Sequence, residues 1–351
     1  MKEARTNARH RPPALGWVFC LCALLLVAGG RASASVSILL EQPYGGYGIV
    51  NPAGHAAIYL DHVCADGPLK LRMCEPGEMG VVISRYDGIG TVDWVAMPLV
   101  PYLYAVNTVA EIPESVDRAT VDRLRDEYRR VNLTALAPDG PDGKTPDGNW
   151  YQLVGSAFDR TIYGFRVNTT LEQDQHLVAL FNDRPNKSRY NGAFTNCADF
   201  VRVTINRYYP HAIRRNFIAD LGMSTPKSVA RSLAHYAHKH PETGMTVFTI
   251  PQVKGSLPRS RPVEGFSEGL LKMYGLPLIL LSPSTAGVAL AAYIGHGRFA
   301  MPKHAPVLEL HDSDTMDATA GGGTPVSSSA QGGAPLGWRT TGLMLVRNRA
   351  Q

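Results

Sequence analysis

The stretch Thr195-Asn196-Cys197-Ala198-Asp199-Phe200-Val201 combines a helix-capping signal with a cysteine. Thr195 or Asn196 can cap a helix, because a short polar side chain there accepts a hydrogen bond from an amide of the first turn. The spacing of the apolar residues that follow predicts a helix that ends near Asn206. Cys197 therefore falls in the first turn of the expected helix.

A cysteine in that position has a chemical and a structural interpretation. Unpaired amides and the positive end of the helix dipole stabilise an anion at a helix N-terminus, and the thiolate is the reactive form of cysteine. Cys197 is thus a candidate nucleophile with a lowered pKa. The alternative is that Cys197 is a small buried apolar residue, as many single cysteines are.

The N-terminus has the pattern of a secretory signal peptide. Basic residues at positions 2–11 precede an apolar run within 15–30, and Ala32-Ser33-Ala34 supplies a small-x-small cleavage pattern. We expect residues 1–34 to be a signal peptide and the chain to be exported, to the periplasm or outside the cell. An uncleaved anchor helix is the weaker alternative, because the apolar run is short.

The charge of the chain is concentrated in this leader. The 351 residues carry 35 Lys and Arg against 30 Asp and Glu, a net charge of +5. Residues 1–34 hold five of those basic side chains and one acidic one, so the rest is close to neutral. A nucleic-acid partner needs a clustered basic face, and none is evident.

Removal of the leader leaves Cys64, Cys74 and Cys197. In an oxidising compartment Cys64 and Cys74 are well spaced to bridge a hairpin. Cys197 would then be the odd thiol, which favours its chemical interpretation.

A second informative stretch is Gly54-His55-Ala56-Ala57-Ile58-Tyr59-Leu60, which reads as a strand. His55, Ala57 and Tyr59 would share one face of it. A turn and a returning segment over 69–73 would form a hairpin, and we expect this to place Glu75 near the level of His55.

The remaining chain predicts a mixture of strands and helices. Further strands are expected over 35–40, 81–84, 94–97 and 102–106; helices are expected over 113–133, after Thr169 or Thr170, and from Thr225-Pro226 onward. The fold class is therefore α+β, with a small antiparallel sheet packed on the cysteine helix. His235 and His238 are poor metal-ligand candidates, since no cysteine or carboxylate completes a set, and neither metal nor cofactor is predicted.

Residues 273–297 contain no Asp, Glu, Lys or Arg. This run is long enough to cross a bilayer, but its prolines suit a broken or buried hairpin better, so membrane contact through 273–297 stays open. We expect a catalytic domain over 35–265, an apolar helical or membrane-associated segment over 266–298, and a mostly disordered, Gly- and Ser-rich tail over 299–351.

The histidine strand and the cysteine helix supply the parts of a thiol active site. An imidazole can take the proton of Cys197 and return it to a leaving group, and amides near the thiol can stabilise an oxyanion. A third polar group would orient the histidine.

These two motifs, in this order, resemble the circularly permuted branch of the NlpC/P60 papain-like superfamily. The opening over 35–60 is also similar to the Lnb-type N-terminal periplasmic domain of bacterial envelope proteins. The resemblance implies hydrolysis or transfer of amide or ester acyl groups, with Cys197 as nucleophile and His55 as base. We assign Glu75 as the third residue, and we interpret Asp199 as a first-turn carboxylate that complements the helix dipole.

The leading hypothesis is a secreted cysteine hydrolase that cleaves amide bonds, in cell-wall peptides for example. Alternatives are a thioester-forming acyltransferase or lipid esterase at the membrane, and a catalytically silent envelope protein that binds through the same cleft.

Overall fold

The computed structural model describes residues 33–45 and 52–310. The chain divides into two units, Met1–Ser33 and Ala34–Gln351, and the fold below is that of the second. The predicted signal peptide lies outside the described residues except for its last two positions, which already belong to the first strand. Positions 311–351 of the predicted tail also lie outside them.

The second unit is built on a six-stranded sheet in the order β6-β5-β2-β1-β8-β9. Its strands are β1 (Ser33–Glu41), β2 (His55–Leu60), β5 (Val81–Ser84), β6 (Val95–Pro98), β8 (Ile162–Thr170) and β9 (Thr246–Ile250). The pairs β1–β2, β2–β5, β5–β6 and β8–β9 are antiparallel. The predicted α+β class is confirmed.

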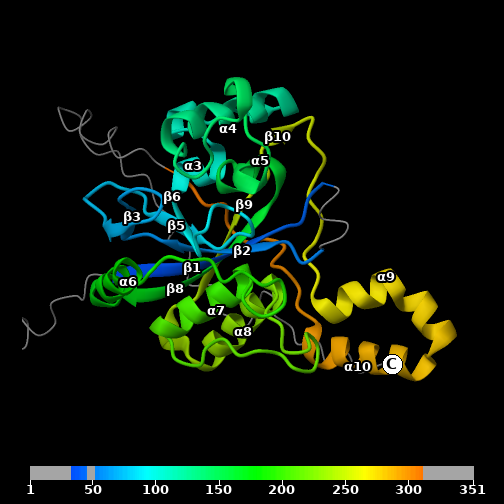
Figure 1. Ribbon diagram of the computed structural model, residues 1–351. Helices are drawn as coiled ribbons and strands as arrows, with labels where there is room; N and C mark the ends of the chain where they lie inside the picture. The colour runs from blue at the N-terminus through cyan, green and yellow to red at the C-terminus, as the bar shows by residue number, and fades with distance from the viewer. Residues whose placement is uncertain (1–32, 46–51, 311–351) are drawn as a thin grey trace, which may run out of the picture. The chain divides into compact units, whose positions relative to one another are not determined.

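Helices cover both faces of this sheet (Figure 1). The face called here the thiol face carries α6 (Leu171–Asp183), α7 (Cys197–Tyr208) and α8 (Pro226–Lys239), and the opposite face, the polar face, carries α3 (Leu99–Tyr104), α4 (Arg118–Asn132) and α5 (Ser156–Asp159). Successive side chains of β2 point to opposite faces of the sheet. The core of the thiol face contains Ala56, Ile58 and Leu60, and the core of the polar face contains Ala57 and Tyr59.

The helices that began with a clear capping signal start where the sequence predicts. Asn196 caps α7, Thr225 caps α8 before Pro226, and Thr170 forms a capping box with Gln173 at the start of α6. The predicted strand over 102–106 is wrong, because this segment lies largely in α3. Residues Leu99 to Leu103 of that helix are all buried, and they are apolar on every side. The sequence therefore shows neither the 3.6-residue spacing of a half-buried helix nor the alternation of a half-buried strand, and the two cannot be told apart from it.

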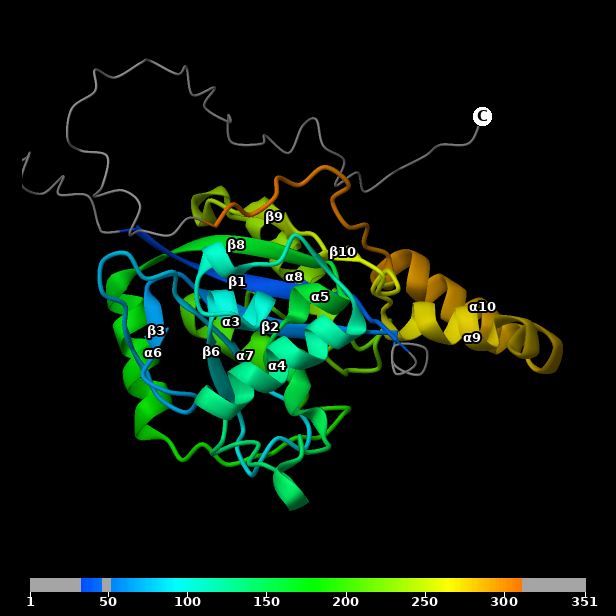
Figure 2. The same ribbon diagram turned by 90° about the horizontal axis from the view of Figure 1, so that it is seen from above.

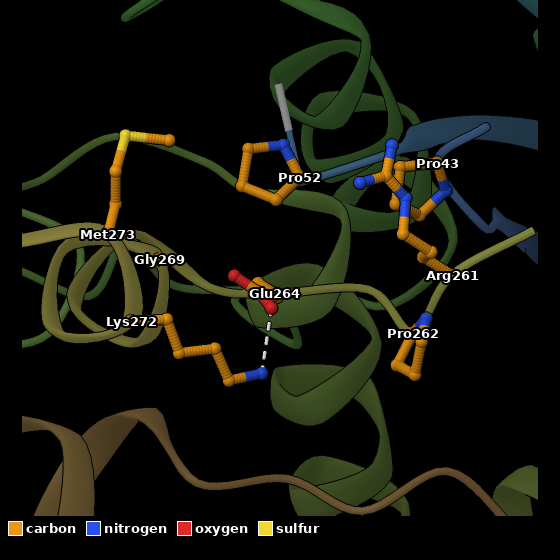
Figure 3. Close-up of a pocket in the computed structure, with 8 residues that line it drawn as sticks. All are labelled: Pro43, Pro52, Arg261, Pro262, Glu264, Gly269, Lys272 and Met273. Carbon is orange, nitrogen blue, oxygen red and sulfur yellow. Dashed lines mark hydrogen bonds and ion pairs between the residues drawn. The ribbon is translucent and has the colours of Figure 1, made fainter. Parts of the chain in front are cut away.

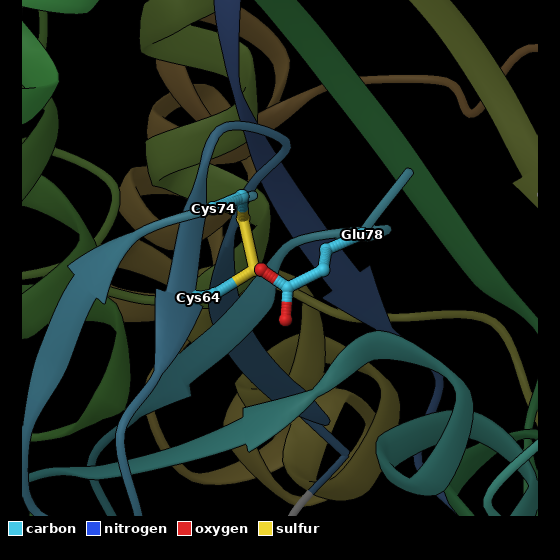
Figure 4. Close-up of side chains that lie close together, drawn as sticks. All are labelled: Cys64, Cys74 and Glu78. Atoms are coloured by element: carbon cyan, nitrogen blue, oxygen red, sulfur yellow. A yellow bond between two sulfur atoms is a disulfide. The ribbon is translucent and has the colours of Figure 1, made fainter. Parts of the chain in front are cut away.

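The predicted disulfide between Cys64 and Cys74 is present, with the two Cα atoms 4.9 Å apart. It joins β3 (Val63–Ala65) to the end of β4 (Leu71–Met73) (Figure 4). Glu78 lies beside the two sulfur atoms, but these are bonded to each other and are no longer thiolates, so the group is not a metal site.

The hairpin is placed differently from the prediction, and this removes Glu75 from the histidine. It follows the far end of β2, where the Cys74 amide donates to the His62 carbonyl. His55 is the first residue of β2, so the six-residue strand separates it from Glu75. Glu75 is exposed, and its amide donates to Glu78 at 2.7 Å.

The charge-free segment folds as a helical hairpin. It consists of α9 (Phe266–Leu281), α10 (Pro283–Ala292) and a π-helical turn (Tyr293–Gly297), and the two helices lie side by side in both views (Figures 1 and 2). Among the described residues, no helix has the length and apolar character needed to cross a bilayer. The start of the predicted tail is ordered: Phe299 is buried in the core of the thiol face, and Val307 bridges to Thr249 of β9.

The remaining elements are short. They are β7 (Ser115–Val116), β10 (Lys254–Gly255) and 3-10 turns over Val109–Glu111, Pro141–Gly143, Asn149–Leu153 and Pro241–Thr243.

Candidate active site

Cys197 is the first residue of α7, and its position is fixed by the capping residue before it. The Asn196 Oδ1 accepts from the Asp199 amide at 2.9 Å, and its Nδ2 donates to the carbonyls of Gly192 and Ser224 at 2.9 and 3.0 Å. One side chain thus caps the helix and ties it to the loops on both sides. The thiol is held by a rigid element rather than by a loop.

The thiol lies against backbone amides and at the edge of a cavity. The backbone amides of Ala56, Ala198 and Cys197 itself act on the thiol and favour its anion. Cys197 is 9% exposed and lines a cavity of about 310 Å³. Amides at a helix N-terminus that surround a nucleophile are suited to stabilise the oxyanion of an acyl-transfer intermediate.

Burial nevertheless raises the pKa of the Cys197 thiol to about 11, although the three amides act to lower it. The sequence predicted a lowered pKa from the helix terminus alone. Desolvation of a thiolate outweighs that effect here, because the sulfur is almost enclosed. The resting form at neutral pH is the thiol.

His55 is held by contacts on the strand next to its own. Its Nε2 lies 2.7 Å from Ser84 Oγ, and the Ser84 hydroxyl donates to the Ala56 carbonyl at 3.1 Å. A hydroxyl has a single hydrogen, so Oγ must accept from the histidine and Nε2 must carry the proton. Nδ1 is then the basic nitrogen of the ring. The ring also stacks on Tyr86, with the centroids 4.7 Å apart.

The imidazole is neutral over the whole physiological range. Burial lowers the pKa of His55 to about 3, and the nearby charge of Arg160 lowers it further. His55 is therefore unprotonated at neutral pH and does not form an ion pair with a resting thiolate.

Cys197 and His55 approach the start of β2 from opposite faces of the sheet. The thiol contacts the amide of Ala56 from the thiol face, whereas alternation puts the His55 side chain with Ser84 and Tyr86 toward the polar face. The Cys197 thiol therefore lies beside the residue that follows His55, the first residue of β2, and on the other face of that strand.

Gly54 is required at that strand end. Its φ is +71°, and a Cβ there would lie 2.1 Å from the Glu41 carbonyl oxygen. Only glycine adopts this conformation without strain and clash, which explains the Gly-His pair of the motif.

A buried polar cluster that the sequence did not predict lies behind His55. Glu41 pairs with His55 across β1 and β2, is fully buried, and bonds Arg160 at 2.8 Å as well as the Tyr102 hydroxyl. Burial raises the pKa of Glu41, while Arg160 opposes the rise. Glu41 directly follows the apolar run Ile38-Leu39-Leu40. A charged residue at the end of such a buried strand is the sequence feature that could have indicated a buried polar cluster.

Asp199 has a structural role, in agreement with the sequence interpretation that it is not catalytic. It is buried and bonds Arg202 and Arg215 at 2.9 and 2.8 Å, and the Ser224 hydroxyl at 3.2 Å. The carboxylate therefore joins α7 to the loop that precedes α8. Among the predicted site residues, Cys197 and His55 lie near the start of β2 on opposite faces of the sheet, and Glu75 lies beyond the far end of that strand.

The cavity beside Cys197 is walled by α9. Its lining includes Leu270, Met273 and Tyr274 of that helix opposite Cys197. A second hollow of about 210 Å³ shares Glu264, Gly269 and Met273 with the first. Figure 3 shows it, with Lys272 bonded to Glu264 at 2.7 Å.

Comparisons with known proteins leave the family open. No protein-family model and no curated protein matches this chain. Among solved structures, the type VI secretion system effector TseH is similar at a TM-score of 0.29 and 12% identity, over 64% of this chain and 95% of that one.

Proposed function

We propose that this chain is an exported thiol enzyme that transfers acyl groups through Cys197, in the manner of a permuted papain-like hydrolase. The observation that carries the proposal is the thiol at the start of α7, at the edge of a cavity and near the amide of the residue that follows His55. Ser84 replaces Glu75 as the third member, because it fixes the tautomer of the base.

The proposed mechanism starts from a neutral Cys197 thiol and a neutral His55 imidazole. As the Cys197 sulfur attacks an acyl carbon, His55 Nδ1 takes the thiol proton, and the amides of Cys197 and Ala198 stabilise the oxyanion. The bond to the leaving group breaks, and the imidazolium protonates the departing amine or alcohol. Water or another acceptor then gives its proton to His55 and attacks the thioester, the carbon–sulfur bond breaks, and the imidazolium returns the proton to the Cys197 sulfur.

An amide in the bacterial cell envelope, such as a cell-wall peptide bond, is the first substrate class. It rests on the signal-peptide pattern at 1–34 and on the thiol chemistry. The periplasm or the exterior of the cell is the corresponding location.

A second class, a lipid ester or an acyl group handed to an acceptor, is favoured by the wall of the cavity. Leu270, Met273 and Tyr274 face the same space as Cys197, and apolar side chains suit an acyl chain better than a peptide.

The test is to incubate the protein with p-nitrophenyl esters of short and long acyl chains and with peptide amides. Intact mass should reveal an acyl adduct on Cys197, and Cys197→Ser should lower turnover by about 10³-fold or more with unchanged thermal unfolding. Hydroxylamine as an added acceptor should trap the thioester as a hydroxamate with the wild-type protein and not with Cys197→Ser. Absence of adduct and turnover with every donor would overturn the proposal in favour of a silent binding protein.

A further inference from the structure

The hairpin formed by residues 273–297, called here the apolar hairpin, exposes large apolar side chains. Leu276, Leu280 and Leu281 of α9 are 70%, 73% and 87% exposed, and Val288 of α10 is 70% exposed. Soluble surfaces seldom gather so many large apolar side chains in one place. Something other than water is therefore expected to surround this hairpin.

The exposed side chains lie on several sides of the hairpin. Ile279 and Leu281, which are 55% and 87% exposed, are two residues apart, so they point about 160° apart around α9. A protein partner covers one stripe of a helix, whereas a lipid phase surrounds it. This distribution favours lipid over a protein groove.

A loop beside the base of the hairpin, residues 217–221 (here the basal loop), adds to the same surface. Phe217, Ile218 and Leu221 are exposed. The Asn216 side chain donates to the His296 carbonyl at 2.9 Å, and the Ser267 amide donates to Ala219 at 3.2 Å. These bonds hold the loop against both ends of the hairpin.

The length of the hairpin fits half a bilayer. α10 has 10 residues, so it is about 15 Å long. The hydrocarbon core is about 30 Å thick, so this length reaches through one leaflet. Lys272 and Arg298 flank the charge-free segment and lie at its base, where lipid headgroups would be.

We propose that the apolar hairpin and the basal loop insert into one leaflet of a lipid bilayer. The cavity of Cys197 then opens at the membrane surface, because its wall is the base of α9. This surface does not depend on the thiol chemistry, and it would persist in a protein without activity.

The test uses the full chain with Cys20, Cys22 and Cys197 each replaced by serine and one cysteine added, Leu281→Cys, labelled with the polarity-sensitive dye NBD. Val131→Cys on α4 is the matched control, because Val131 is also apolar and 78% exposed. Vesicles contain phosphatidylethanolamine and phosphatidylglycerol, with nitroxide-labelled lipid as quencher. We expect a blue shift and quenching at position 281 and neither at position 131.

A second pair of variants measures the contribution of the side chains. In a protein labelled with NBD at position 276 (Leu276→Cys), the double substitution Leu280→Glu and Leu281→Glu should weaken partitioning of the protein into vesicles by about tenfold or more. Val131→Glu in the same labelled protein should not weaken it. The proposal would be overturned if NBD at position 281 showed the same emission maximum with vesicles as NBD at position 131, since both dyes would then be in water. A blue shift that appears without vesicles and grows with protein concentration would also overturn it, since it would assign the hairpin to a second copy of the chain.

Discussion

The two faces of the sheet contribute to the candidate site in different ways. On the thiol face, one helix and one capping side chain place Cys197 beside an apolar cavity. On the polar face, His55 is held in a buried network that reaches Ser84, Tyr86 and Glu41 from three strands and a loop. Cys197 is positioned by local structure and His55 by long-range contacts. Substitutions on the two faces should therefore affect stability and activity differently.

The largest effect on stability is expected from the polar face. Arg160→Met removes the partner of the buried Glu41 carboxylate and leaves a desolvated charge, which costs about 3–5 kcal/mol. Arg118→Met is the control, because Arg118 is half exposed where it pairs with Asp159, and should cost at most about 1 kcal/mol. Urea unfolding measures both. Equal losses would mean that the Glu41–Arg160 pair is not the buried element described here.

A smaller effect, on catalysis, is expected from the residue that orients the His55 ring. Ser84→Ala removes the acceptor of the Nε2 proton, and kcat/KM should fall by about 10–100-fold through kcat, because the hydroxyl does not touch substrate. The nitrogen-15 chemical shifts of His55 should then report mixed tautomers, which a purely structural role would not produce.

The matched control is Ser37→Ala on β1. Ser37 is also a buried serine, and its hydroxyl has no hydrogen-bond partner within the described part of the chain. Activity should be retained there. An equal loss in both variants would assign Ser84 a packing role only.

A third effect is a dependence of stability on pH. The pKa of His55 is about 3 in the folded chain and about 6.5 when unfolded. The unfolded state therefore binds the extra proton between these values, and stability falls as pH decreases below about 6.5, by at most about 1.4 kcal/mol per pH unit. His55→Gln should flatten that slope between pH 6.5 and pH 4 in thermal unfolding. An unchanged slope would show that other groups cause it.

The same contrast explains what the sequence could predict. The helices of the thiol face carry local signals. The sequence offered Thr195 or Asn196 and Thr169 or Thr170 as caps, and the structure uses Asn196 and Thr170, whereas Thr225 before Pro226 was predicted directly. The disulfide followed from spacing within a short hairpin.

The contacts of the polar face have no local signal. Ser84 lies 29 residues from His55, and its role depends on the register of β2 and β5. Glu75 was chosen on an assumed hairpin geometry, but the hairpin extends from the other end of β2. The raised pKa of Cys197 also depends on tertiary burial, which the position in a helix cannot reveal.

The most direct test of the account is the rate at which Cys197 is acylated by a p-nitrophenyl ester in the wild-type protein and in His55→Asn. General-base catalysis by His55 predicts that the acylation burst slows by about 10²–10⁴-fold in the variant. It also predicts that the wild-type rate, but not the variant rate, falls in D₂O. Acylation of His55→Asn at the wild-type rate would contradict transfer of the thiol proton to this imidazole.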